Sequence, residues 1–85
     1  MLINMKEDIE QKIREYLSKT AEIPAAELDA DTMLSEYGIT SLQFMECVAE
    51  IENIFDIHFS ERDLNDIYTI DDFVIKVEKK INERT

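Results

Sequence analysis

The sequence predicts an all-α fold: a small antiparallel four-helix bundle with three longer helices, one short helix and a long loop between the first two. Several segments repeat apolar residues at spacings of three and four, which places those residues on one face of a helix. No segment alternates apolar and polar residues over the length of a strand, and no Asn-Gly hairpin turn occurs. We therefore expect little or no sheet, and a bundle of this kind follows from the helix lengths.

The first helix is expected over residues 3–18. Its apolar face repeats every three or four residues, through Leu2, Met5, Ile9, Ile13 and Tyr16. Asn4 is the expected N-cap, with Glu7 three positions later, and Pro24 argues against continuation. Residues 20–40 show weak periodicity and are expected to form a loop across the bundle. That loop can bury four apolar side chains, namely Ile23, Leu28, Met33 and Leu34.

The second helix is expected to begin after Thr40, which acts as N-cap with Gln43 as its capping-box partner, and to continue to about Phe55. Its core face comprises Phe44, Val48, Ile51 and Phe55, and its polar stripe comprises Gln43, Glu46, Glu50 and Asn53. Leu42, Met45 and Ala49 fall between the two faces. They are either the ordinary margin of the core or the apolar part of a partner-binding surface.

Two further caps predict the remaining helices. Ser60 with Asp63 starts a short helix that carries Leu64 and Ile67. Thr69 with Asp72 starts the last helix in the same way. The core face of this last helix repeats through Ile70, Phe73, Val74, Val77 and Ile81.

The chain of 85 residues is long enough for a single domain, 1–85, and no more. Cys47 is the only cysteine and His58 the only histidine, so an internal disulfide is excluded and no metal site is expected. Cys47 is expected to be a small buried hydrophobe. The N-terminus lacks the apolar core of a signal peptide, and no stretch approaches 18 apolar residues. We expect a cytoplasmic protein without membrane insertion.

Negative charge is concentrated in the middle of the chain. The protein carries 20 Asp and Glu against 9 Lys and Arg, for a formal charge of -11. Between Lys19 and Arg62 there are ten acids and no base. A phosphate backbone would be repelled, which argues against nucleic-acid binding. The acids either keep a small protein soluble or form a docking surface for enzymes with basic patches.

A motif lies at the start of the second expected helix. The chain places an Asp, a Leu three residues on, an aromatic residue with Gly, and Ser-Leu at fixed spacing, as Asp31, Leu34, Tyr37, Gly38, Ser41 and Leu42. This pattern resembles the acyl carrier protein family, which includes polyketide and peptidyl carrier domains. Residues further along fit the same register, namely Glu52, Phe55, Phe59, Leu64, Ile67 and Ile70. The resemblance therefore covers nearly the whole chain.

The resemblance implies that Ser41 carries a 4′-phosphopantetheine arm, transferred from coenzyme A by a phosphopantetheinyl transferase. An acyl group would be held as a thioester on the thiol of that arm. The first turn of a helix suits a phosphodiester, because free N–H groups and the helix dipole offset its charge. The chain would act as a monomer without catalytic residues, presenting its cargo to acyl-loading and acyl-processing enzymes of fatty acid, polyketide or related biosynthesis. The implied partner surface is Leu42, Met45, Glu46, Ala49 and Glu50.

Two positions depart from the family pattern. Thr40 stands where the family usually has Asp, and Gln43 replaces a commonly acidic residue. Threonine still caps a helix, so the fold tolerates the change, but the lost charge bears on which transferase modifies the protein. The positions of Phe44, Val48, Ile51 and Phe55 match those that line an acyl shelter in some carriers. Large phenylalanines there can instead fill the core, and the sequence leaves both readings open.

Other functions fit the residues less well. A serine hydrolase needs a general base beside Ser41, but His58 is the only imidazole and the G-x-S-x-G elbow is absent. Calcium binding fails because the loop starting at Asp29 and Asp31 places Met33 where a third oxygen ligand is needed. Two alternatives stay open: an aminoacyl or peptidyl carrier, and an unmodified acidic helical adaptor, which needs no hydroxyl at position 41.

Overall fold

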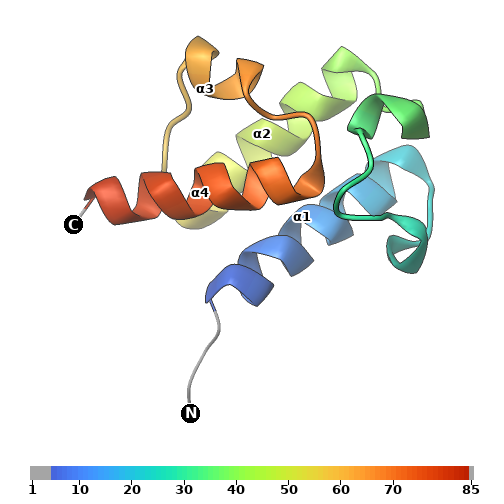
Figure 1. Cartoon of the computed structure of the whole chain (residues 1–85), viewed down its shortest axis with the longest axis horizontal. Coiled ribbons are helices and arrows are strands. Elements are labelled where there is room, and N and C mark those ends of the chain that lie inside the picture. The colour runs from blue at the N-terminus through green and yellow to red at the C-terminus, as the bar shows by residue number, and fades with distance from the viewer. Residues whose placement is uncertain (1–4, 85) are drawn as a thin grey trace.

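The computed structural model describes residues 5–84 and is all-helical over that range. Its four α-helices are α1 (Met5–Ala21), α2 (Ser41–Phe55), α3 (Glu61–Asn65) and α4 (Ile70–Arg84). In Figure 1, α1 packs against both α2 and α4 and runs antiparallel to them. Helices α2 and α4 share one direction, because the segment with the short α3 returns the chain. The predicted fold class, a small helical bundle with one short helix, is confirmed.

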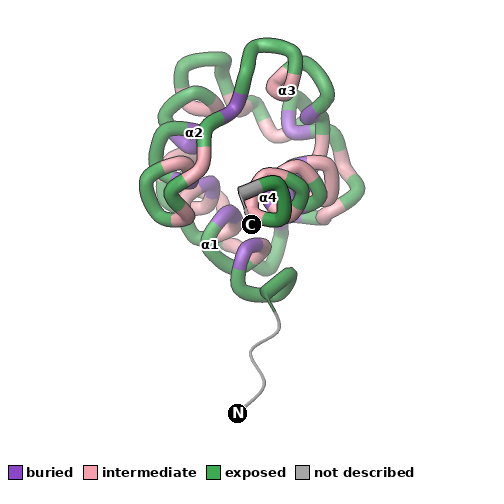
Figure 2. Tube along the Cα trace, turned by 90° about the vertical axis from the view of Figure 1, so that its left-hand side faces the viewer, coloured by how far each residue is buried: buried purple, intermediate pink, exposed green. Residues whose placement is uncertain are grey.

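The core lies where α1, α2 and α4 face one another (Figure 2). Its buried residues from these helices are Ile9, Ile13, Leu17, Cys47, Val48, Ile51, Ile70, Phe73, Val74 and Val77. The ring of Phe73 is central: its centroid lies 5.8 Å from that of Phe44 and 6.0 Å from that of Phe59. Removing this apolar surface from water is the main force that holds the helices together. No helix within residues 5–84 combines the length and apolar character needed to span a bilayer.

Helix α1 ends three residues later than expected. It continues to Ala21, after which Glu22 adopts a left-handed conformation (φ 58°) and the N–H of Ile23 donates to the carbonyl of Ser18 at 3.2 Å. This is the hydrogen bond of a Schellman motif, which terminates a helix without glycine when the tertiary packing holds the turn. The predicted end at residue 18 was wrong because isolated Ser and Thr are tolerated in a last turn.

The core face of α1 is also shifted from the expected one. Met5 is 48% exposed, whereas Leu17 is fully buried one turn beyond Ile13. The expectation that Met5 lies in the core was wrong, because the first turn of α1 extends past the helices against which it packs. The predicted cap Asn4 and the apolar Leu2 lie outside the described residues.

The long connection between α1 and α2 contains two short 3₁₀ helices, η1 (Ala25–Glu27) and η2 (Leu34–Tyr37), that the sequence patterns did not reveal. Leu28 and Leu34 are buried and Ile23 is partly buried, as expected for a loop lying across the bundle. Met33 is 46% exposed, which corrects the expectation that it is buried. It precedes the turn of η2 and lies at the rim of a groove described below.

Hydrogen bonds fix this connection at both ends. The Nη1 atom of Arg14 in α1 donates to the carbonyl oxygens of Ala25 and Leu28. Near α4, the N–H of Leu34 donates to the carbonyl of Tyr68 at 2.8 Å. The N–H of Asp71 likewise donates to Ala30 at 3.0 Å. The connection is therefore an ordered part of the fold, and it delivers the chain to the start of α2 in a defined position.

The three predicted caps of α2, α3 and α4 are confirmed. Each is a pair in which the first side chain accepts from the N–H of the second residue and the second returns the bond: Thr40–Gln43, Ser60–Asp63 and Thr69–Asp72. The pattern was readable because it links residues only three positions apart. Helix α3 is shorter than expected and ends at Asn65, with Ile67 buried just beyond it.

Candidate functional site

Ser41 is the first residue of α2, and its side chain is exposed. The N–H of Gln43 donates to Oγ1 of Thr40 at 3.1 Å, and the N–H of Phe44 donates to the Thr40 carbonyl at 2.9 Å. The N–H groups of Ser41 and Leu42 have no partner within the described residues. Together with the positive end of the helix dipole, they favour an anion at this turn.

Gly38 sets the approach of the chain to Ser41. It caps η2 in the left-handed conformation, with φ 74°, and its N–H donates to the carbonyl of Ser35 at 3.1 Å. A Cβ atom built here meets nothing within 4 Å. The demand for glycine therefore comes from the backbone angle and not from crowding.

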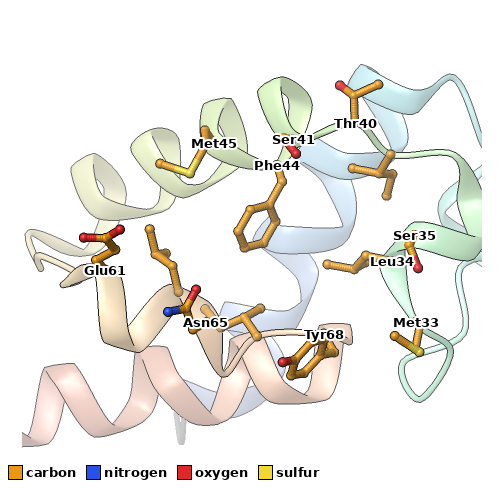
Figure 3. Close-up of a pocket in the computed structure, with 13 residues that line it drawn as sticks. Met33, Leu34, Ser35, Thr40, Ser41, Phe44, Met45, Glu61, Asn65 and Tyr68 are labelled. Carbon is orange, nitrogen blue, oxygen red and sulfur yellow. The ribbon is translucent and has the colours of Figure 1, made fainter.

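An open groove of about 510 Å³ lies beside Ser41, between α2, α3 and the η2 segment (Figure 3). Its apolar lining comprises Met33, Leu34, Ile39, Phe44, Met45, Leu64 and Ile67. Polar groups from Ser35, Glu61, Asn65 and Tyr68 also line it. In Figure 3 the ring of Phe44 projects from α2 into the middle of this space. The site thus joins an exposed hydroxyl to a mixed apolar and polar hollow.

The four residues expected to line a shelter for an acyl chain do not line one common cavity. Phe44 lines the groove, whereas Val48 and Ile51 are buried in the core. Phe55 is partly buried at the other end of α2, outside the groove. Sequence reasoning missed the far wall, which Asn65 and its neighbours supply. Leu64 and Ile67 were expected in the short helix, but only the tertiary fold brings them and Asn65 to the same groove as Ser41.

The five residues named as a partner surface all face solvent. Leu42 is 70% exposed and Met45 46%, and Glu46, Ala49 and Glu50 are exposed beside them. They follow Ser41 along one side of α2. This surface is therefore apolar next to the hydroxyl and acidic further along.

The other reactive side chains lie apart from Ser41. Cys47 is fully buried, as expected, and burial with a smaller contribution from the charge of Glu50 raises the pKa of its thiol to about 12. The imidazole of His58 is 89% exposed and lies 3.4 Å from the carboxylate of Glu52, beyond the opposite end of α2 from Ser41. Within residues 5–84, no three His, Cys, Asp or Glu side chains are grouped to hold a metal ion.

Comparison with known proteins gives relatives of two kinds. An acyl carrier protein homolog from Mycoplasmopsis pulmonis is 29% identical over 69 residues, which are 80% of this chain and 94% of that protein. The acyl carrier protein of the Onion yellows phytoplasma is 30% identical over 81% of this chain and 92% of its own length. A non-reducing polyketide synthase from Emericella nidulans is 31% identical over 91% of this chain, which corresponds to only 3% of the synthase. No solved structure shows significant similarity.

The profile of a protein family described as "Phosphopantetheine attachment site" matches residues 11–76. The matched range starts in α1 and ends in α4, and it includes the whole groove and the first turn of α2. Because the match spans most of the helical bundle, we conclude that the chain belongs to the phosphopantetheine attachment family of carrier proteins, whose cofactor is covalently held 4′-phosphopantetheine.

Proposed function

We propose that Ser41 is the attachment residue and that the protein carries acyl groups, as thioesters on the arm, between enzymes of fatty acid, polyketide or related biosynthesis. The observation that carries this proposal is the placement of Ser41. The exposed Ser41 is the first residue of α2, where the first N–H groups have no partner within their own helix, and it lies inside the range matched by the family profile. Transfer forms a bond between the Ser41 oxygen and the phosphopantetheine phosphorus, which gives a phosphodiester. The bond from this phosphorus to the nucleotide breaks and releases adenosine 3′,5′-bisphosphate from coenzyme A. The hydroxyl proton is released to the base.

The surroundings of Ser41 suit a carrier better than an enzyme. His58, the only imidazole, lies beyond the other end of α2, so no histidine activates the Ser41 hydroxyl as in a hydrolase. The transferase must therefore supply the base. In this role the chain presents a substrate and lacks catalytic residues of its own.

The exposed side of α2 is the proposed contact surface for the transferase and the acyl-processing enzymes. Leu42 and Met45 offer apolar contact next to the arm, and Glu46 and Glu50 offer charges for Arg or Lys on the partner. Such complementary charge mainly speeds the encounter of two proteins. The negative charge extends over the whole segment between Lys19 and Arg62, which contains no Lys or Arg.

The test is to incubate the apo protein with coenzyme A and a broad-specificity phosphopantetheinyl transferase and to measure the intact mass. We expect a gain of one phosphopantetheine unit, which Ser41→Ala abolishes. Ser35→Ala is the matched control, since this serine lines the same groove and should leave modification intact. Circular dichroism establishes that both variants remain folded. No gain with several transferases would favour the unmodified adaptor instead.

The cargo is the finer question. An aminoacyl or peptidyl carrier is the second candidate, and the polar lining of the groove from Asn65 and Glu61 gives a specific reason to test it. Loading the arm with matched acyl and aminoacyl groups and comparing the NMR shifts of groove residues separates the two. Larger shifts with the aminoacyl group favour the second candidate.

A further inference from the structure

The side chain of Gln43 connects the end of α1 to the start of α2, near Ser41. Its Oε1 accepts from the N–H of Thr40 at 2.9 Å, which completes the capping box of α2. Its Nε2 donates to the carbonyl of Thr20 at 3.2 Å. Thr20 lies in the last turn of α1, where carbonyl groups have no partner within their own helix. One side chain therefore satisfies an orphan group at the end of α1 and another at the start of α2.

Only an amide makes both bonds at neutral pH. A glutamate keeps the bond to the Thr40 N–H but has no donor for the Thr20 carbonyl, and it sets a negative charge against the negative end of α1. A methionine of similar length makes neither bond. The residue type, and not merely its polarity, is therefore matched to the two contacts.

The bond between Gln43 and Thr20 joins α2 to α1 close to the first turn of α2, which contains Ser41. Gln43 is two residues from Ser41, and its bond to Thr20 joins residues 23 positions apart in the sequence. On the groove side, the first turn of α2 is held by Phe44, whose ring centroid lies 5.8 Å from that of Phe73. The Gln43–Thr20 bond adds a polar link to this packing, and it joins the first turn of α2 directly to α1.

We propose that Gln43 is a positioning residue for the modification of Ser41. Its amide holds the first turn of α2 against the last turn of α1, so that the hydroxyl is presented in one orientation to the transferase. This inference rests on the proposed function, since it concerns the same hydroxyl. It adds a requirement that the capping box alone does not impose, namely a hydrogen-bond donor at position 43.

The experiment measures kcat and KM for phosphopantetheine transfer, with the carrier as the varied substrate. Gln43→Glu keeps the capping box and removes the donor, and Gln43→Met removes both bonds. Gln11→Glu is the matched control: Gln11 is exposed on α1, donates to Glu15 in the same helix, and undergoes the same change of charge. The assay temperature is chosen so that circular dichroism shows every variant folded. Should Gln43→Met fail to fold, Gln43→Glu carries the test alone.

We expect kcat to fall about fivefold or more in both Gln43 variants, which corresponds to one lost hydrogen bond, with KM within about twofold of the parent. Gln11→Glu should keep both constants. Unchanged kcat in Gln43→Glu overturns the proposal, as does a change confined to KM, which would make Gln43 a contact residue. If Ser41→Ala still gains the arm in the same assay, the proposed function fails, whatever the Gln43 variants do.

Discussion

The carboxylate of Asp63 in α3 lies 2.7 Å from the Nζ atom of Lys80 in α4. Lys76 lies 3.8 Å from the other oxygen of the same carboxylate and 3.2 Å from Asp66. Helix α3 has no fully buried residue; its Leu64 is partly buried against the core, and these ion pairs add polar contacts with α4. Because α3 forms one wall of the groove beside Ser41, the pairs also help to set the shape of that groove.

Asp63→Asn should make the fold less stable at neutral pH and less sensitive to acid. The hydrogen bond from Lys80, with that from the N–H of Ser60, holds the pKa of Asp63 well below its usual range. A carboxyl with a lowered folded pKa stabilises the protein above its unfolded pKa of about 3.9, and this contribution disappears as the pH falls toward the folded value. Asparagine keeps the cap but not the charge. Urea unfolding at pH 7 should show that the variant has lost about 1 kcal/mol of unfolding free energy relative to the parent. Below pH 4 this difference should be smaller.

Asp66→Asn is the matched control for this prediction. Asp66 is the cap residue that follows α3, but its side chain is 64% exposed and its ion pair is with Lys76. An exposed ion pair of this kind contributes little to stability, so the free energy of unfolding should change by less than about 0.5 kcal/mol. Equal losses in the two variants would show that general charge balance, and not the Asp63–Lys80 contact, stabilises α3.

Arg14→Lys should destabilise the connection between α1 and α2. The guanidinium of Arg14 donates to the Ala25 and Leu28 carbonyls through Nη1 and contacts the Glu10 carboxylate at 2.9 Å through Nε. A lysine ammonium cannot reach all three in that geometry. We expect the free energy of unfolding, measured in urea, to fall by about 1–3 kcal/mol. The same change at the exposed Arg62, in α3, should cost much less, and similar losses at both sites would contradict the assigned role.

The helices and caps could be predicted because their signals are local. Apolar spacing marked α2 and α4, and the Thr40–Gln43 box was visible as two residues three apart. The end of α1 at Ala21 and the exposure of Met5 depend on tertiary packing. Local sequence patterns do not reveal this packing. For the same reason, Ser41 could be singled out from its motif, but the Gln43–Thr20 bond could not, since it joins two helices.

Cys47 should remain unreactive toward thiol reagents in the native apo protein at pH 7. The side chain is fully buried and its pKa is about 12, so almost no thiolate is present and no reagent reaches it. Labelling with a disulfide reagent should occur only at the rate of unfolding and become fast in urea. The modified protein should then show one reactive thiol, that of the arm. Rapid labelling of the folded apo form would disprove this burial.

Reversing Glu46 and Glu50 to Lys should slow transfer of the arm to Ser41, with the larger effect at low salt. Both carboxylates are exposed on α2 next to Leu42 and Met45, where a basic partner would approach. Electrostatic steering changes the association rate and is screened above about 0.15 M salt, so kcat/KM should fall by roughly tenfold at low salt and by less at high salt.

The control for this charge reversal is Asp8→Lys with Glu83→Lys. It changes the net charge equally, but these residues belong to the outer turns of α1 and α4, at the end of the bundle away from the start of α2 (Figure 1). If steering depends on the α2 surface, this pair should reduce kcat/KM far less than the Glu46 and Glu50 pair. Equal reductions would mean that total charge governs the encounter, and the exposed side of α2 would then lose its assigned role as the contact surface.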